Sequence, residues 1–250
     1  MAGHSKWSNI KHRKGAQDKK RAQLFTKLAK EVTIAAKEGG KDINFNPRLR
    51  LALEKAKKQS MPKDNIDRAI KKGTGELAGV EYVEIRYEGY GPGGTAFIVE
   101  VVTDNKNRSA SSVRSNFAKN GGNLGADGAV AWDFEKKGQI FIKSEGLDAD
   151  EFMMEAIELG AEDVVEDDDM FEVLTDPTEL NQVNEALKNA GFESEEAEIV
   201  MLPKNKVKVE DLETAEKVLK LYEALEDNED VNDVYSNFDI SDELMEEIMG

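Results

Sequence analysis

The sequence contains no cysteine, and none of its apolar runs approaches the ~20 residues that a membrane-spanning helix needs. The lack of cysteine excludes disulfides and thiolate metal sites, and it favours a reducing compartment. The opening residues, MAGHSKWSNIKHRKGAQ, are basic but lack the apolar stretch of a signal peptide. We therefore expect a cytoplasmic protein with no membrane partner.

Residues suited to catalysis are also scarce. The only two histidines, His4 and His12, lie in a basic segment that is too polar to form a rigid site. The glycine-rich residues 89–94 lack the Gly-Lys-Ser/Thr ending of a P-loop and join two predicted strands, so they are more typical of a hairpin turn. Residues 166–169 are acidic, but without EF-hand spacing they are more typical of a solvated turn than of a Mg²⁺ or Ca²⁺ site. We therefore expect that the protein is not an enzyme and that it binds no metal, cofactor or small-molecule substrate.

Positive charge is scarce overall but concentrated at one end of the chain. The whole sequence has 34 Lys and Arg against 51 Asp and Glu, a net charge of −17. Residues 1–75 carry 20 of the basic residues and only 7 of the acidic ones, a net charge of +13, which leaves −30 for the remainder. This asymmetry indicates a basic segment directed at an anionic partner.

Residues 1–20 contain few apolar groups, so we predict a flexible arm in the free protein. Each cation that neutralises a phosphate releases counterions, which makes binding to nucleic acid steeply salt-dependent. Trp7 lies among these cations and can stack on an unpaired base. A merely solvated tail, with Trp7 packed on the first helix, is the alternative. The binding residues predicted in and next to this arm are Lys6, Trp7, Lys11, His12, Arg13, Lys14, Lys19, Lys20 and Arg21.

Three short helices are predicted after the arm and complete a domain of residues 1–75. Apolar residues at helical spacing indicate helices over residues 21–38 and 47–59, and a third helix follows Pro62 and ends at Gly73. No recognition-helix pattern of a helix-turn-helix protein stands out. Further nucleic-acid-binding residues are predicted on the surfaces of these helices: Lys27, Lys30, Arg48, Lys55, Lys58 and Arg68, with Lys57, Lys71 and Lys72 extending the same basic surface.

From residue 80 the apolar period changes to that of strands, and the order β-β-α-β is predicted over residues 82–87, 95–103, 107–120 and 129–135. The turn over residues 88–94 would expose an aromatic at its tip. The start of the predicted helix combines polar side chains with free backbone N–H groups, which suits a phosphate, although helix capping accounts for the same residues. The candidate residues for a second contact are Tyr90, Asn105, Asn107 and Arg108.

A second series begins at Gln139 and follows the order β-α-β-β-α-β of a ferredoxin-like domain. Its elements are predicted at residues 140–143, 149–159, 163–166, 170–174, 179–190 and 197–202. A last helix (212–225) and strand (231–238) have no partner nearby, whereas the earlier β-β-α-β lacks an α-β unit. We therefore predict a three-domain α+β protein. Its parts are a helical domain (1–75), a middle α/β domain (80–135 and 205–250) and an inserted ferredoxin-like domain (136–204).

Several long motifs resemble the YebC family. They are the opening MAGHSKW, the following IKHRK, the loop YEGYGPGG at residues 87–94, TDN with NR at residues 103–108, and GGNLG at residues 121–125. The resemblance covers the whole chain in order and implies a helical N-terminal domain followed by two α/β domains, one inserted in the other. It also implies a regulator of gene expression. Bacterial members are described as probable DNA-binding transcriptional regulators, whereas a mitochondrial branch of translational activators connects the family with the ribosome and stalled translation.

The sequence thus predicts a non-enzymatic nucleic-acid-binding regulator of gene expression, whose partner is DNA or ribosomal RNA. A DNA-binding transcriptional regulator is one form of this hypothesis. A ribosome- or RNA-binding translation factor is the second form, and a disordered basic arm that folds on binding suits structured RNA as well as a DNA minor groove. An acidic protein-interaction module with an incidental basic tail is the alternative from another class.

Overall fold

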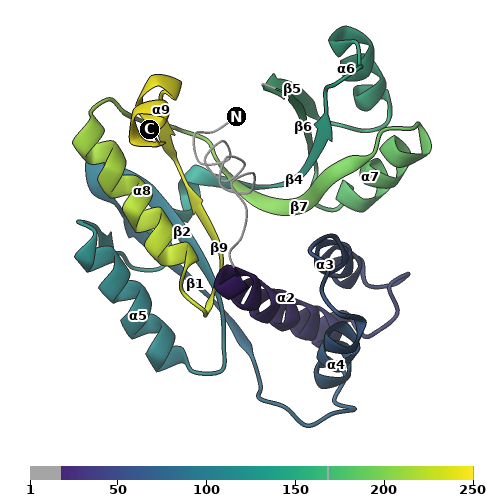
Figure 1. Cartoon of the computed structure of the whole chain (residues 1–250), viewed down its shortest axis with the longest axis horizontal. Helices are drawn as coiled ribbons and strands as arrows, with labels where there is room; N and C mark the ends of the chain where they lie inside the picture. Colours follow the sequence, from purple (N-terminus) through teal and green to yellow (C-terminus); the bar gives the residue numbers. More distant parts are fainter. Residues whose placement is uncertain (1–17, 168, 250) are drawn as a thin grey trace. The chain divides into compact units, whose positions relative to one another are not determined.

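The computed structural model describes residues 18–167 and 169–249 of the chain. These residues form two compact units, one from Phe134 to Leu202 and the other from the remaining described residues on both sides of that segment. The second unit contains both the basic helices and a four-stranded sheet (Figure 1). None of the helices in the described parts of the chain is long and apolar enough to cross a membrane.

The basic helices are α2 (Asp18–Gly39), α3 (Pro47–Lys58) and α4 (Lys63–Gly73). Small and aliphatic side chains fill the space between them, with Val32, Leu49 and Ala69 almost fully buried. Asn46 caps α3 by accepting a hydrogen bond from the Leu49 backbone N–H, and Pro47 follows at the first helical position. The three predicted helices are present, but the predicted extent of the arm was wrong at its end, because α2 already begins at Asp18.

The middle domain is an antiparallel sheet in the order β3-β1-β2-β9. Its strands are β1 (Val83–Tyr90), β2 (Ala96–Thr103), the two-residue β3 (Asn123–Leu124) and, from the end of the chain, β9 (Val231–Ser236). The helices α5 (Lys106–Lys119) and α8 (Leu212–Glu226) lie side by side over one face (Figure 1), where their apolar residues join Phe97 and Val99 of β2 in one core. The tail of the chain therefore completes the sheet that β1 and β2 begin, as the sequence predicts.

The segment Phe134–Leu202 contains the ferredoxin-like order of elements with the sheet order β5-β6-β4-β7. A stack of aromatic rings fills part of its core, with the ring centroids of Phe152 and Phe171 4.4 Å apart. The α+β fold with one α/β domain inserted in the other is confirmed. The bounds of its elements are β4 (Phe134–Lys143), α6 (Ala149–Glu158), β5 (Asp163–Asp167), β6 (Met170–Thr175), α7 (Leu180–Asn189) and β7 (Ser194–Pro203).

Two local predictions around the first junction were wrong. The predicted strand at 129–135 is instead a short 3-10 turn, η2 (Ala131–Asp133), that leads into β4 at Phe134. The reason is the buried carboxylate of Glu88, which accepts hydrogen bonds from the backbone N–H groups of Gly128, Val130 and Ala131 and so holds this segment in a turn. The strand predicted at 140–143 is present, but it is the second part of β4, which begins six residues earlier. The turn predicted at 88–94 is also shorter, because β1 continues to Tyr90 and only the 3-10 turn η1 (Pro92–Gly94) follows.

The end of the chain contains elements that the sequence did not predict. The predicted last strand divides at Asn237 into β9 and β10 (Phe238–Ile240), and β10 pairs in parallel with β8 (Val207–Val209). The side chain of Asn237 accepts a hydrogen bond from the Ala96 backbone N–H, 2.7 Å away, and this contact occupies the point of division. A final helix, α9 (Asp242–Met249), follows.

The sequence predicts an inserted domain of residues 136–204, and the compact unit of the structure runs from Phe134 to Leu202. A fragment of residues 134–203 tests whether this segment is a domain. Because its sheet and helices share an aromatic core of their own, we expect this fragment to fold cooperatively when expressed alone. The measurement is a urea titration followed by far-UV circular dichroism. A fragment without a cooperative transition would show that the inserted segment depends on the rest of the chain.

Candidate nucleic-acid interface

The structure divides the predicted cations of the basic region into three groups. The positions Lys6, Trp7, Lys11, His12, Arg13 and Lys14 lie outside the described residues, as do the side chains of Lys19 and Lys20. Arg21 is exposed, with its guanidinium carbon 5.5 Å from the centroid of the Phe25 ring. The remaining predicted cations belong to α2, α3 and α4, where some contact the protein itself and others point to solvent.

Lys30 is buried, so its prediction as a surface contact was wrong. Only 8% of the residue is exposed, and its ammonium donates to the carbonyl oxygens of Val102 and Glu229 and to Asp230 Oδ1 at 2.8–3.1 Å. Lys27, one turn earlier on α2, donates to the Glu226 carbonyl oxygen. The two lysines therefore join α2 to the middle domain, because three carbonyls and a carboxylate surround them there.

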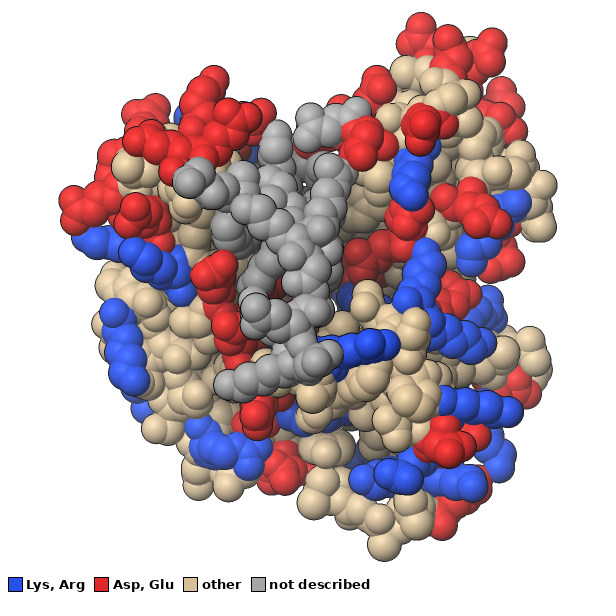
Figure 2. Space-filling model, viewed as in Figure 1, with Lys and Arg blue, Asp and Glu red and all other residues tan. Residues whose placement is uncertain are grey.

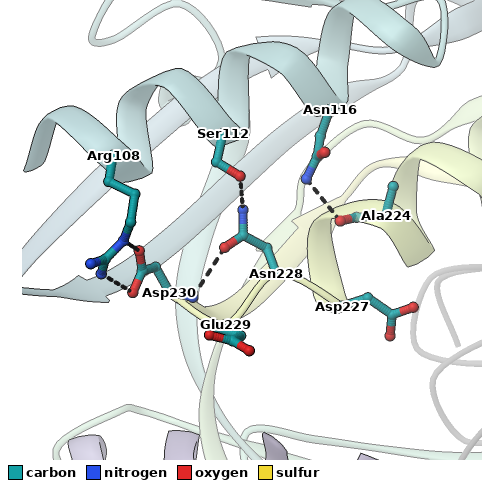
Figure 3. Close-up of a pocket in the computed structure, with 8 residues that line it drawn as sticks. All are labelled: Arg108, Ser112, Asn116, Ala224, Asp227, Asn228, Glu229 and Asp230. Carbon is teal, nitrogen blue, oxygen red and sulfur yellow. Dashed lines mark hydrogen bonds and ion pairs between the residues drawn. The ribbon is translucent and has the colours of Figure 1, made fainter. Parts of the chain in front are cut away.

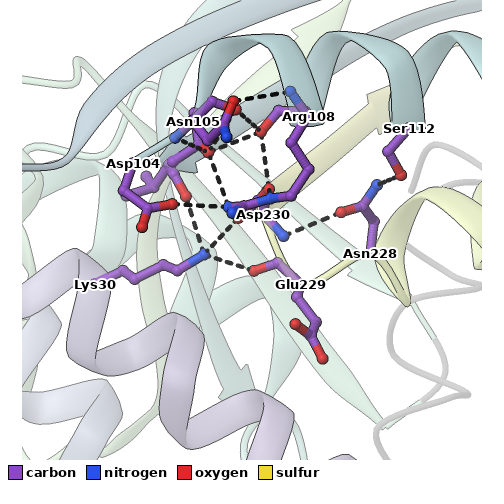
Figure 4. A network of polar contacts seen from close by, with 11 residues as sticks. Lys30, Asp104, Asn105, Arg108, Ser112, Asn228, Glu229 and Asp230 are labelled. Carbon is purple, nitrogen blue, oxygen red and sulfur yellow. Dashed lines mark hydrogen bonds and ion pairs between the residues drawn. The ribbon is translucent and has the colours of Figure 1, made fainter. Parts of the chain in front are cut away.

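The carboxylate of Asp230 is the centre of this contact (Figure 4). Besides Lys30 it receives hydrogen bonds from the Arg108 guanidinium and from the Ser109 hydroxyl, each 2.8 Å long. Burial alone would raise the pKa of Asp230, but the hydrogen bonds from Lys30, Ser109 and Arg108 lower it below its ordinary value of 3.8. Asp230 is therefore an anion that α2 and α5 both bind.

Arg48 is likewise engaged within the protein. Its guanidinium contacts the carboxylates of Glu31 at 2.8 Å, Glu38 at 2.7 Å and Glu84 at 2.5 Å. Burial opposes its charge, but the hydrogen bonds to Glu84 and Glu31 outweigh burial and raise the pKa of Arg48 above its ordinary value. A phosphate at Arg48 would have to displace these carboxylates, so the structure does not favour this predicted contact.

A solvent-facing group of cations remains on α3 and α4. Arg68, Lys71 and Lys72 lie at positions i, i+3 and i+4 and so share one face of α4. All three are exposed, as are Lys57 and Lys58 at the end of α3, whereas Lys55 is half-buried. Figure 2 shows Lys and Arg atoms gathered over α3 and α4, and Asp and Glu atoms gathered over α6 and α9. We call Lys57, Lys58, Arg68, Lys71 and Lys72 the helical cation group.

The predicted second contact is occupied by intramolecular hydrogen bonds. Asn105 caps α5 by accepting from the Arg108 backbone N–H at 3.1 Å, which is the capping alternative, and the Arg108 side chain binds Asp104 and Asp230. Asn107 is exposed in the first turn of α5. Tyr90 is not at the tip of a turn as predicted but ends β1, where its hydroxyl donates to the Ala129 carbonyl oxygen at 2.9 Å.

A hollow of about 370 Å³ lies beside the Asp230 contact (Figure 3). Its two asparagine side chains are already engaged, since Asn228 donates to the Ser112 hydroxyl and Asn116 donates to the Ala224 carbonyl oxygen. Three carboxylates against one guanidinium make it unfavourable for phosphate. The residues that line it are Arg108, Ser112, Asn116, Ala224, Asp227, Asn228, Glu229 and Asp230.

Two exposed aromatic residues were missed by the sequence reasoning. Phe45, in the loop between α2 and α3, is 83% exposed, and Trp132, in the turn before β4, is 68% exposed. An aromatic residue between two asparagines in a loop, as in Asn44-Phe45-Asn46, was a signal that could have been used for Phe45. Among the described residues there is no group of three or more His, Cys, Asp and Glu side chains that could hold a metal ion.

The fold and the cations together define a class of protein, a three-part α+β protein with a basic helical domain. Two family models match the chain, the TACO1/YebC protein N-terminal domain at residues 5–76 and the TACO1/YebC second and third domain at residues 82–238. The chain belongs to the TACO1/YebC family.

Similar proteins extend over nearly the whole chain. A probable transcriptional regulatory protein of Fusobacterium nucleatum is 68% identical over 248 residues, which cover 99% of this chain and 100% of that protein. One of Halothermothrix orenii is 54% identical, with 99% of each chain covered. The crystal structure of a conserved hypothetical protein from Aquifex aeolicus matches with a TM-score of 0.83 and 48% identity, over 89% of this chain and 91% of that one. The first two of these relatives are named probable transcriptional regulatory proteins.

The buried anion generates a prediction for stability. Replacing Asp230 with Asn should lower the free energy of unfolding by about 3 kcal/mol at neutral pH, because the buried Lys30 ammonium loses its counter-charge. Since the native pKa of Asp230 lies below 3.8, its contribution is complete above that pH and is lost as the pH falls through the native pKa. Urea unfolding should therefore show a gap between the two proteins that narrows below about pH 4. Glu229→Gln, a change at the exposed neighbouring carboxylate, should leave stability nearly unchanged at every pH.

Proposed function

We propose that this protein is a non-enzymatic nucleic-acid-binding regulator of gene expression. It binds phosphates through residues 1–21 and the helical cation group. The observation that carries the proposal is the charge of residues 1–75, +13 in a chain whose net charge is −17. Cations that contact phosphates and release counterions supply most of the affinity of such proteins. The names of the relatives support a role in gene regulation.

The contacts within the helical domain refine which cations belong to the proposed interface. Lys27, Lys30 and Arg48 contact carbonyls and carboxylates of the protein, so we assign them to structure instead. Arg68 and Lys57 are exposed and form no ion pair with the described residues, and they remain candidates for phosphate contacts. The proposed interface therefore contains fewer helix-borne cations than the sequence indicates, and they belong to the outer faces of α3 and α4.

The proposal separates into two forms that differ in the polymer. The names of the relatives favour DNA and transcription. Residues 76–250 carry a net charge of −30 and would be repelled by a long duplex, which favours binding by one end of the molecule alone. Structured RNA also permits such local binding. Crosslinking in cells, followed by sequencing of the bound nucleic acid, distinguishes the two forms. Recovery of promoter DNA supports transcription, and recovery of ribosomal RNA supports translation. Enrichment of neither would contradict both forms and favour a protein-interaction module.

Removal of residues 1–17 should abolish detectable binding to nucleic acid, because it deletes four cations of the proposed interface together with Trp7 and His12. The deletion ends before α2 begins at Asp18, so the described fold should remain intact. Binding is measured by fluorescence anisotropy at several salt concentrations, with circular dichroism as the control for folding. Unchanged affinity in the truncated protein would contradict the role of this segment.

The helical cation group can be tested with a matched pair of variants. Arg68→Ala/Lys72→Ala should weaken binding and reduce the slope of log K against log salt by about 1 to 2, since each lost phosphate contact removes about one released counterion. Lys217→Ala/Lys220→Ala removes two exposed lysines that pair with glutamates one turn earlier on α8, and it should leave the slope unchanged. An equal loss of affinity in both variants would show that binding depends on the net charge of the protein and not on the helical cation group.

A further inference from the structure

The buried carboxylate of Glu88 stabilises a turn at residues 126–133 of the middle domain. Glu88 is 6% exposed and accepts three backbone hydrogen bonds, from Gly128 at 2.9 Å and from Val130 and Ala131 at 2.8 Å. Burial opposes ionisation, but these bonds outweigh it and lower the pKa of Glu88, so the carboxylate is charged at neutral pH. The backbone of the turn is thereby fixed to β1.

Two exposed aromatic residues are attached to this turn through one shared acceptor. The hydroxyl of Tyr90 and the indole N–H of Trp132 both donate to the carbonyl oxygen of Ala129, at 2.9 and 3.0 Å. Their polar atoms are thus satisfied within the protein, although Tyr90 is 39% and Trp132 68% exposed. Two large rings held at the surface by the same backbone acceptor offer flat apolar faces that a ligand can contact.

The backbone and the buried side chain of Asp133 hold Lys204 and Asn205 next to Trp132. Asp133 is 5% exposed, and its backbone carbonyl accepts from the Lys204 N–H at 2.7 Å while its side chain binds Asn205. The Lys204 ammonium reaches the Trp132 carbonyl oxygen at 3.2 Å and keeps further donors for a ligand. Residues 203–209 also include Lys206 and Lys208 and contain no acidic residue, whereas the middle domain as a whole is acidic.

We propose that Tyr90, Trp132 and Lys204 form a platform that binds an unpaired nucleotide, with the base stacked on Trp132 and the phosphate on Lys204. The inference rests on the proposed function and adds a second, single-strand-selective contact outside the basic N-terminal region. Stacking on aromatic rings tolerates any base, because every base has a π-face, and the lysine supplies the charge that a phosphate requires. Duplex nucleic acid keeps its bases paired and so cannot use the platform.

A basic peptide is the competing ligand, because a guanidinium also stacks on tryptophan. The lysines of residues 204–208 disfavour it, since they repel a cationic group at the position where they attract a phosphate. Asp133, next to Trp132 in the chain, is buried and already binds Asn205 and Asn237. Asp127 is then the one exposed carboxylate of residues 126–133, against three lysines at residues 204–208. The local charge therefore favours the nucleotide.

The test uses the full chain with Trp7→Phe, which leaves Trp132 as the only tryptophan. An oligouridylate of about 12 nucleotides should quench the Trp132 fluorescence saturably, and the matching duplex should not. In the wild-type background, Trp132→Ala should weaken binding of the single strand about tenfold and leave duplex binding within twofold. Trp132→Phe should restore most of the loss, because it retains an aromatic face. Lys204→Ala should reduce the salt slope for the single strand by about 1.

Met154→Ala is the matched control, because Met154 is 63% exposed and lies in the inserted segment. It should bind both probes like the wild type. Binding of the single strand without any fluorescence response, together with wild-type affinity of Trp132→Ala, would overturn the platform and leave the proposed function intact. Quenching by an oligoarginine peptide but not by the oligouridylate would overturn it in favour of a protein ligand. Failure of the wild type to bind any nucleic acid would instead contradict the proposed function.

Discussion

The carboxylate of Asp230 joins three segments that are distant in the sequence. Lys30 reaches it from α2, Arg108 and Ser109 reach it from α5, and Asp230 itself precedes β9 in the tail of the chain. A buried ion pair contributes little net stability, but removal of one partner is costly, so such contacts select one arrangement over others. Part of the contact between α2 and the middle domain therefore depends on a residue that the tail of the chain supplies.

This constraint explains why the sequence overestimated the basic surface. Lys27, Lys30 and Arg68 look alike in the sequence, because each is a cation on an amphipathic helix. Only the tertiary structure shows that the first two face carbonyls and a carboxylate of the middle domain, whereas Arg68 faces solvent. The distinction depends on partners about 200 residues away along the chain, and no local pattern records them. The helix-capping role of Asn105, in contrast, is local, and the sequence did include it as an alternative.

The same division between local and distant causes accounts for the fold. Apolar periodicity located the helices of the basic domain and the order of elements in the inserted domain, because it depends on residues within one element. It failed at residues 129–135, where the distant carboxylate of Glu88 turns a strand-like sequence into a 3-10 turn. It also failed for β8 and β10, which are three residues long and exist only because they pair with each other. Trp132 lies within the predicted strand at 129–135, where an aromatic residue is common, so its exposure has no signal in the sequence pattern.

Net charge is a poor guide to binding in this protein, since charges act locally. At physiological ionic strength the Debye length is about 8 Å, so an exposed charge acts mainly on groups within that distance. Cations on the helices and the lysine beside Trp132 can each attract a phosphate in a chain of net charge −17. The two proposed contacts differ in their physics. Phosphate contacts weaken as salt rises, whereas base stacking is nearly independent of salt, so the affinity for single strands should fall less steeply with salt, per nucleotide bound, than charge alone implies.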